Sequence, residues 1–476
     1  MHKTNNFAFK NKLHYKLDFI VAIFIILTTS FTLFALTTFG QATVPAKGMN
    51  SNFPRRKIPT VFPKLQQPTK PGKIKNVILM IGDGMGKEEV KAASCFAYGK
   101  AGQLSFQQMP VQGEAQTYAF KIDKNTGKQI RTITDSAAAA TALATGRKVL
   151  NGTISQARPG DQKSLTTILE QAQNASWKTG LVTSCFITHA TPACFAAHTR
   201  NRNSYRKIGR QMLASKIDLM FGGGCFMMRS AQAKRSGYKV VKNRKQMKAL
   251  KSLDTPVLGR FGYGHLPYEF SGRAANIKGY NWTGPIGKRK PRAAYKQGKG
   301  ADFDTLPHLS EMTAKALNLL STDNKKGFFL MVEGGKIDHA GHANHLANNI
   351  YETLEFDLAV RKVLEWAKDR DDTLVIVTAD HETGGLKVTK NNGIGKFPDA
   401  TWSTGRHSNA DVYVYAWGVG AQLFKGKMNN IEIPQKIRRI ILEHGSKKAK
   451  KAFSEGGPIA PKRVTAPVTA PAKKVA

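Results

Sequence analysis

The chain has 476 residues, and its 73 Lys and Arg against 32 Asp and Glu give a formal net charge of +41. This length suffices for a large buried core, in one large domain or in two smaller ones. The positive charge indicates attraction to anions such as nucleic acid, an anionic envelope or phosphorylated substrates. No zinc-finger, RRM or basic-zipper pattern accompanies the charge, so specific nucleic-acid recognition is not expected.

Residues 1–42 have the composition of a targeting segment. Four lysines between residues 3 and 16 precede an uncharged, mostly apolar run over residues 19–39. Small residues at 40 and 42 suit cleavage by a signal peptidase, although the run is also long enough to span a bilayer. A signal peptide cleaved near Ala42 is the favoured interpretation, and a retained membrane anchor is the alternative. Either way the bulk of the chain is predicted to be exported, to a periplasmic, extracellular or membrane-anchored location.

The chain contains four cysteines, at Cys95, Cys185, Cys194 and Cys225. An even number of cysteines in an exported chain permits disulfides, and four cysteines allow three pairings. The spacing does not resemble a zinc ribbon, and an oxidising compartment permits bridges without requiring them. The sequence therefore leaves the pairing open.

Four short apolar runs predict buried parallel strands, after a Pro- and Lys-rich linker over residues 43–75. The runs lie at residues 76–81, 179–184, 327–332 and 373–379. Apolar residues at three- and four-residue spacing predict helices over 309–320 and 350–368. Alternating strands and helices predict a domain over residues 76–445 with an α/β fold, a three-layer sandwich around a mostly parallel sheet.

Metal-type ligands follow several of these strands directly. They are Asp83, Glu333, Asp380 and His381. In open α/β sheets, ligands bind beyond the carboxyl ends of the strands, so these side chains are expected to meet at one edge of the sheet.

Residues 131–146 carry the first candidate for chemistry. A β-branched run ends at Asp135 and Ser136, a run of alanines opens a helix, and Gly146 suits its end. Ser136 is therefore predicted at a helix N-terminus, where unpaired N–H groups and the helix dipole favour an anion. Taken alone, the stretch is better explained by Asp135 and Ser136 acting only as helix caps.

Residues 333–342 carry the second candidate. Asp338 and His342 are four residues apart, so one helical turn places both on the same face, and carboxylate with imidazole suits zinc. Glu333, at a strand end, is free to bind a harder ion through oxygen. The alternative is a polar loop with a capping aspartate.

The third candidate is the adjacent pair Asp380 and His381, which can both turn inward at the break between a strand and a loop. His407, before a strand predicted at residues 411–416, would alone be read as a solvated loop histidine. Together with a nearby arginine, these groups suit phosphoryl transfer with two close metal ions. The candidate arginines are Arg200, Arg202 and Arg206.

Two further stretches differ in composition. Residues 226–305 are rich in Lys, Arg and Gly and are predicted to form a basic surface excursion on the main domain. Residues 446–476 consist largely of Lys, Ala and Pro and are predicted to be a disordered tail.

The motifs in their order resemble the alkaline phosphatase family over roughly residues 75–445. They are IGDGMG at 81–86, TDSAA at 134–138, HATPA at 189–193, VEGG at 332–335, IDH at 337–339 and TADHE at 378–382. No single motif is specific, but together they are highly so. The resemblance implies an alkaline phosphatase-like fold and an exported phosphatase that hydrolyses phosphate monoesters.

The resemblance also implies a role for each candidate residue. Ser136 would be the nucleophile that forms a phosphoserine, and Arg202 would clamp the phosphate. Two zinc ions and one magnesium ion would bind per subunit. The first zinc would be held by Asp338, His342 and His407, the second by Asp83, Asp380 and His381, and the magnesium by Asp83, Thr191 and Glu333. A water on the first zinc would then hydrolyse the phosphoserine, with retention at phosphorus overall.

The sequence departs from the enterobacterial pattern of the family at two positions. His189 and His339, expected on the substrate side of the metals, stand where those enzymes have Asp and Lys, and both match the animal-type enzymes. The third site's metal is therefore open. The short gap between His381 and His407 predicts a small or absent crown subdomain, which leaves a homodimer possible but poorly supported.

Two other functions compete with this interpretation. A phosphodiesterase or sulfatase of the same superfamily is disfavoured by Ser136, because such diesterases typically use Thr and sulfatases use a modified residue in a different motif. A non-enzymatic protein that binds anionic polymers through its basic surface would not need the full set of ligands. The tail's lysines motivate one hypothesis, that charge retains the protein on an anionic envelope.

Overall fold

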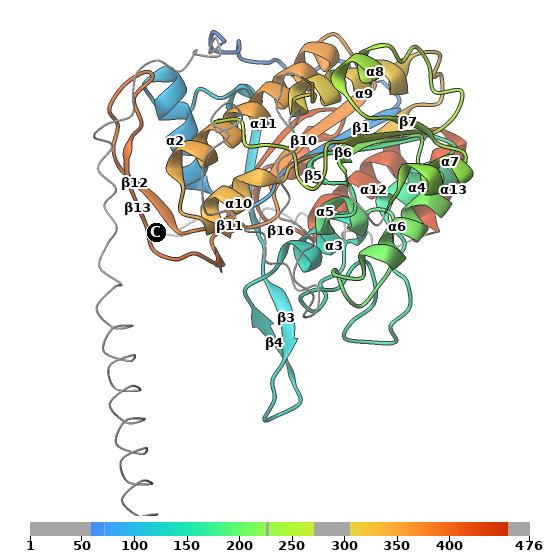
Figure 1. Ribbon diagram of the computed structural model, residues 1–476, viewed down its shortest axis with the longest axis horizontal. Helices are drawn as coiled ribbons and strands as arrows, with labels where there is room; N and C mark the ends of the chain where they lie inside the picture. Colours follow the sequence, from blue (N-terminus) through green and yellow to red (C-terminus); the bar gives the residue numbers. More distant parts are fainter. Residues whose placement is uncertain (1–58, 71, 225–227, 271–304, 456–476) are drawn as a thin grey trace, which may run out of the picture. The chain divides into compact units, whose positions relative to one another are not determined.

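A ten-stranded β-sheet forms the centre of the computed structural model, which describes residues 59–70, 72–224, 228–270 and 305–455 (Figure 1). The strands lie in the order β16-β2-β15-β10-β1-β9-β5-β6-β8-β7. Their bounds are β1 Asn76–Gly82, β2 Val111–Gln116, β5 Lys178–Phe186, β6 Leu219–Gly223, β7 Lys239–Val241, β8 Val257–Phe261, β9 Phe328–Gly334, β10 Thr373–Ala379, β15 Val412–Gly418 and β16 Gly426–Asn429. Only β15 runs antiparallel to its neighbours β10 and β2.

The four predicted strands are confirmed as β1, β5, β9 and β10, and they are neighbours at the centre of the sheet. Every residue of β1 is buried, as is every residue of β9 and β10. Such continuous apolar runs are typical of parallel strands covered on both faces.

Helices cover both faces of the sheet, with α9 and α11 on one face and α4, α5 and α12 on the other (Figure 1). The longer helices are α2 Lys87–Tyr98, α3 Ser136–Thr145, α6 Tyr205–Ala214, α9 Leu309–Ser321, α11 Leu346–Ala367, α12 Glu432–His444 and α13 Lys447–Ser454. The shorter ones are α4 Ile168–Asn174, α5 Ala190–Cys194, α7 Ser230–Arg235, α8 Arg244–Lys248 and α10 Lys336–His342, with 3-10 turns at Ser105–Gln108 and Ala421–Phe424. The predicted three-layer α/β sandwich is therefore confirmed.

Three two-stranded ladders lie outside the central sheet. They are β3 Ala119–Ile122 with β4 Gln129–Thr132, β11 Glu382–Thr383 with β14 His407–Ser408, and β12 Leu386–Lys390 with β13 Asp399–Trp402. The hairpin of β3 and β4 projects from the sheet domain (Figure 1). Between His381 and His407 the chain forms only the last two ladders, in agreement with the prediction of a small or absent crown subdomain.

The predicted surface excursion over residues 226–305 is wrong for much of its described part. Strands β7 and β8 pair in parallel and extend the central sheet beside β6. Val257, Leu258 and Phe261 are buried there, whereas Lys239 is exposed. The exposed side chains set the basic composition and obscured the strands. Residues 271–304 lie outside the described part of the chain.

The predicted disordered tail is also wrong at its beginning. Helix α13 starts at Lys447, and the hydroxyl of the preceding Ser446 caps it by accepting from the backbone N–H of Ala449. Phe453 is buried beside Trp177, with 5.8 Å between ring centroids. The apolar residues Ala449, Ala452 and Phe453 face the domain at helical spacing and bury the helix. Residues 456–476 lie outside the described part.

The predicted linker packs on the sheet domain over residues 59–70. Phe62 is buried, and the indole of Trp417 donates a hydrogen bond of 2.7 Å to the carbonyl of Gln66. The linker prediction is therefore wrong for this part. The predicted targeting segment, including residues 19–39, lies outside the described residues. Within the described residues, no helix combines the length and apolarity that a membrane span requires.

Candidate active site

The candidate site lies at the carboxyl edge of the sheet, where three neighbouring strands end level with one another. Gly82 at the end of β1 pairs with Ala379 of β10 on one side and Gly334 of β9 on the other. The residues at these ends therefore converge. Asp83, Glu333 and Asp380, all fully buried, meet there as the sequence predicted.

Ser136 is the first residue of α3, and its hydroxyl faces this acidic edge. Ser136 Oγ lies 3.3 Å from His381 Nε2 and 3.5 Å from Asp83 Oδ1. The capping role falls to Asp135, whose carboxylate accepts from the N–H of Ala138 at 2.9 Å. The capping alternative thus holds for Asp135 alone, and the hydroxyl of Ser136 is left to face the acids at a helix N-terminus.

Arg202 is tied to the start of α3 through the same aspartate. Its Nη1 lies 3.0 Å from Asp135 Oδ2, and its backbone N–H donates to the carbonyl of Gly152. Although burial acts in the opposite direction, the carboxylate of Asp135 raises the pKa of Arg202, which keeps the guanidinium charged. Arg200 and Arg206, the other candidates, are exposed.

Asp338, His342 and His407 form the first group of metal-type ligands. Asp338 Oδ1 lies 3.4 Å from His342 Nε2 and 3.3 Å from His407 Nε2, and the two Nε2 atoms are 3.0 Å apart. Each ring donates its Nδ1 proton to a backbone carbonyl, of Gly405 and Thr134 respectively. The facing Nε2 atoms therefore need a cation or a shared proton between them, which is the arrangement of a histidine-ligated metal.

Asp83, Asp380 and His381 form the second group. His381 Nε2 lies 3.2 Å from Asp380 Oδ2 and 3.5 Å from Asp83 Oδ1. Asp380 Oδ1 accepts from the N–H groups of Gly84 and His381, while Asp380 Oδ2 and Asp83 Oδ2 have no hydrogen-bond partner. Because β10 ends at Ala379, both adjacent side chains turn inward, as the sequence predicted.

Asp83 also belongs to a third group with Glu333 and His189. Glu333 accepts from the hydroxyl of Thr183 through one oxygen, and its Oε1 has no partner. Burial raises the pKa of Glu333 to about 7, against the opposing effect of the Thr183 and Thr191 hydroxyls. Thr191, on α5, is buried, and its hydroxyl has no hydrogen-bond partner.

At the buried carboxylates of Asp83 and Glu333, the attraction of Arg202 does not offset the effect of burial and of the neighbouring acids on the pKa. Burial raises the pKa of Asp380 to about 7, and burial with repulsion from Asp380 and Asp338 raises the pKa of Asp83 well above its usual value. Unpaired buried acids of this kind favour bound cations. The donor chemistry fits the expected metals, since imidazole with carboxylate suits zinc and carboxylate with hydroxyl suits magnesium.

His189 belongs to the third group and His339 lies beside it, with their ring centroids 5.8 Å apart. Burial lowers the pKa of His339 to about 4 and the pKa of His189 well below its usual value. Both rings are therefore neutral and able to act as ligands. The predicted site residues thus lie at the same edge of the sheet or contact side chains that do.

Three neighbours of the site were not predicted. Thr383 donates to Asp338 Oδ1 at 2.6 Å and lies 3.2 Å from His381 Nδ1, so it links the first two groups. Thr183 contacts Glu333, and the ring of His265 lies 4.5 Å from that of His339. Thr383 follows His381 by two residues, which could have suggested it. His265 comes from a distant loop and gives no local signal.

Cys95, Cys185 and Cys194 are buried free thiols. The bridges that the sequence left open are therefore not formed among these three, and Cys225 lies outside the described residues. Cys194 contacts the hydroxyl of Thr141 and the carbonyl of Ala137.

A serine hydroxyl at a helix N-terminus, a fixed guanidinium and buried groups of metal ligands are the components of metal-assisted phosphoryl transfer. The chain belongs to the alkaline phosphatase family, whose sequence model matches residues 74–398. Membership of this family makes the protein a metal-requiring hydrolase of phosphate monoesters.

Individual relatives agree with this assignment. The chain is 33% identical over 420 residues to streptomycin-6-phosphate phosphatase of Streptomyces griseus, covering 76% of this chain and 89% of that one. It is 35% identical over 342 residues to alkaline phosphatase of Escherichia coli, covering 64% and 70%.

Solved structures agree as well. The alkaline phosphatase of the Antarctic bacterium TAB5 matches with a TM-score of 0.60 and 32% identity over 78% of this chain and 98% of that one. The cold-active enzyme of Shewanella sp. gives a TM-score of 0.62 and 28% identity over 76% and 98%. A variant of the TAB5 enzyme, 30% identical with a TM-score of 0.61 over 78% and 99%, has Mg bound in its M3 site.

Proposed function

We propose that this protein is an exported alkaline phosphatase that acts through a phosphoserine at Ser136, with two zinc ions and one magnesium ion. The observation that carries the proposal is the position of the Ser136 hydroxyl. It is buried at the first position of α3 and lies within 3.5 Å of one ligand atom each of Asp83 and His381.

Three sets of residues would hold the ions. Asp338, His342 and His407 would hold one zinc, Asp83, Asp380 and His381 the other, and Asp83, Thr191 and Glu333 the magnesium. The orphaned oxygens of Asp83, Glu333 and Asp380 and the facing nitrogens of His342 and His407 support this assignment. Bound zinc and magnesium would lower the pKa of the attacking oxygen and neutralise charge that develops on the phosphoryl and leaving oxygens.

The reaction consists of two in-line displacements at phosphorus, in which Ser136 is first the nucleophile and then the leaving group, and regains a proton from the attacking water. In the first, its Oγ attacks phosphorus, the Oγ–P bond forms, the ester P–O bond breaks, and the alcohol leaves with a proton. In the second, a water oxygen attacks phosphorus, the Oγ–P bond breaks, and inorganic phosphate leaves. The N-terminus of α3 stabilises the phosphoryl oxygens in both steps. Two inversions give net retention at phosphorus.

Arg202 binds two phosphate oxygens through its guanidinium. Asp135 positions it, since their ion pair of 3.0 Å fixes the guanidinium against the start of α3. His189 and His339 lie on the substrate side of the third group and would tune its affinity for magnesium. All proposed contacts are made to phosphate and none to the alcohol, so broad tolerance of phosphate monoesters is expected.

The test is the Ser136→Ala variant of the full chain, assayed with a chromogenic phosphate monoester at alkaline pH. Turnover is expected to fall by about a thousandfold or more, because the nucleophile is lost. The control is Ser215→Ala, which removes a hydroxyl at the end of α6 that donates only to the carbonyl of Met212. A folded Ser136→Ala variant with the wild-type rate would sink the proposal.

The composition of residues 1–42 supports the proposal that the protein is exported. The net charge of +41 supports the proposal that it contacts anionic polymers. Because α13 is part of the fold, the role of the tail is tested by truncation after residue 455, not after residue 445. Weaker binding of the truncated protein to anionic vesicles is expected if the terminal lysines contribute. Unchanged binding would rule the tail out.

A further inference from the structure

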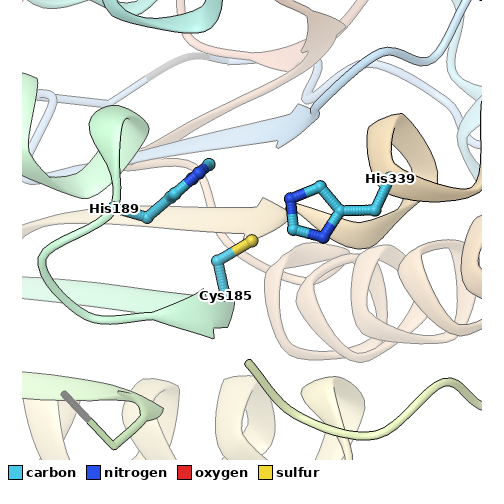
Figure 2. A group of neighbouring side chains, drawn as sticks. All are labelled: Cys185, His189 and His339. Atoms are coloured by element: carbon cyan, nitrogen blue, oxygen red, sulfur yellow. The ribbon is translucent and has the colours of Figure 1, made fainter. Parts of the chain in front are cut away.

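A cluster of soft and borderline ligands lies next to the proposed catalytic groups and shares only His189 with them. Cys185 stands near the end of β5, His189 at the start of α5, and His339 on α10. Figure 2 shows the three side chains pointing toward one another, with the sulfur between the two rings. One ligand atom of each lies within 4.8 Å of the other two.

We propose that Cys185, His189 and His339 form a further metal site, which takes a thiophilic divalent cation of the zinc type. Thiolate and imidazole are the ligands that such ions prefer, whereas magnesium prefers oxygen. One zinc ion with bonds of about 2.3 Å to sulfur and about 2.1 Å to nitrogen would draw the three ligand atoms closer together than the 4.8 Å that bounds their present separations.

The cluster contains a buried polar atom that has no hydrogen-bond partner. His189 is 8% exposed, and its Nδ1 has no hydrogen-bond partner. A buried nitrogen without a partner is costly unless an ion or ordered water completes it. His265 lies beside the cluster, with its ring centroid 4.5 Å from that of His339 and 5.5 Å from that of His189, and its Nδ1 is also without a partner.

The backbone leaves room for the sulfur at this position. A Cβ on Gly335 would come within 2.6 Å of Cys185 Sγ, so the thiol packs directly on a glycine of the loop before α10. The backbone N–H of Cys185 donates to the hydroxyl of Thr183 at 2.8 Å. Binding would release the thiol proton to solvent as the sulfur takes up the ion, with no change of oxidation state.

This site is chemically distinct from the three catalytic groups, which contain no sulfur. It nevertheless shares His189 with the group of Asp83 and Glu333. An ion bound to Cys185 therefore competes for a ring that also faces the proposed magnesium ligands. The proposal does not depend on Ser136 being the nucleophile.

The experiment uses Co2+ as the probe, added to the full chain after chelation. Co2+ bound to thiolate gives an intense ligand-to-metal charge-transfer band in the near ultraviolet, which oxygen and nitrogen ligands alone do not give. Wild-type protein is expected to develop this band, and Cys185→Ser and Cys185→Ala are expected to lose it. Cys95→Ser, which removes a buried thiol on α2 away from the cluster, is the matched control and should retain the band.

The outcomes decide the proposal separately from the phosphatase assay. Absence of the band in folded wild-type protein, or its persistence in folded Cys185→Ser and Cys185→Ala, would overturn the site even if phosphatase activity is normal. If neither cysteine variant folds, His339→Gln replaces them and is expected to raise the Co2+ concentration at half-saturation by about tenfold or more. An unchanged half-saturation point would also overturn the site.

A second titration tests the shared ring. In saturating Mg2+, a higher Co2+ concentration is expected to be needed for the charge-transfer band to appear, because both ions would bind His189. A band that develops identically with and without Mg2+ would contradict the shared use of that ring.

Discussion

Asp135 performs three tasks with one carboxylate. It caps α3 at Ala138, accepts from the N–H of Gly152, and holds Arg202 at 3.0 Å. A single residue therefore positions both the helix that carries the proposed nucleophile and the proposed phosphate clamp. The capping pattern was readable from the sequence, but its link to Arg202, 67 residues away, was not.

Replacing Arg202 tests the clamp. Arg202→Ala is expected to lower kcat/KM for a phosphate monoester by about 10- to 100-fold, because two charge-assisted hydrogen bonds to phosphate are lost. Steady-state kinetics would measure this, with Arg206→Ala as control, since Arg206 is exposed. Equal kcat/KM in both variants would remove Arg202 from the phosphate site.

A second prediction concerns pH. Burial alone would lower the pKa of His198, but hydrogen bonding to Glu170 at 2.8 Å outweighs it and raises the pKa. Because the pKa of His198 is higher in the folded protein than the usual value of 6.5, protonated His198 stabilises the fold at a pH below 6.5. This stabilisation is lost as the pH rises through the pKa of His198 in the folded protein.

His198→Gln should therefore lower the free energy of unfolding by about 1 kcal/mol near pH 6 and by less near pH 9. Chemical denaturation of both proteins at each pH measures it. The exposed His444 supplies the control variant, His444→Gln. A difference that grows toward pH 9 would contradict the assigned ion pair.

At the scale of elements, central strands were predictable and edge elements were not. Strands β1, β9 and β10 are mostly apolar runs bounded by loops, so their composition predicts burial on both faces. Strand β7 has only 3 residues and begins with an exposed lysine. Its place in the sheet depends on pairing with β8, which no local pattern encodes.

Helix α13 was missed for a different reason. Its lysines dominate the composition, while the apolar spacing of Ala449, Ala452 and Phe453 carries the fold signal. Phe453→Ala is expected to lower the free energy of unfolding by about 3 kcal/mol, because a buried ring is lost and a cavity is left. Lys451→Ala, at an exposed position of the same helix, should change it by less than about 0.5 kcal/mol.

Denaturation curves of both α13 variants make this comparison. Equal stabilities would mean that α13 does not pack on the domain. The same result would reinstate the prediction of a disordered tail from residue 446.

At the scale of the whole molecule, stability is tied to metal content. Asp83, Glu333 and Asp380 are buried together and repel one another without a cation. Chelation is expected to lower the melting temperature by about 5 °C or more, and added zinc and magnesium should restore it. Thermal denaturation with and without chelator measures this.

Glu333→Gln tests whether repulsion among the buried carboxylates is what destabilises the metal-free protein. It removes one of the repelling charges, so the metal-free variant should melt no lower than the metal-free wild type and should gain less from magnesium. A melting temperature that chelation leaves unchanged would show that the acids do not bind a stabilising ion.

The ladder of β11 and β14 ties the ligands of two proposed metal groups to each other. Thr383, two residues after His381, pairs with His407, and Glu382 pairs with Ser408. The chain between them runs out along β12 and back along β13, and Ile394 near the tip is 69% exposed. Because the chain leaves and returns along these two strands, the tip is a suitable insertion site for protein engineering. A reporter or affinity domain inserted at Ile394 would be anchored at both ends while the ladder at the base holds His407 in register.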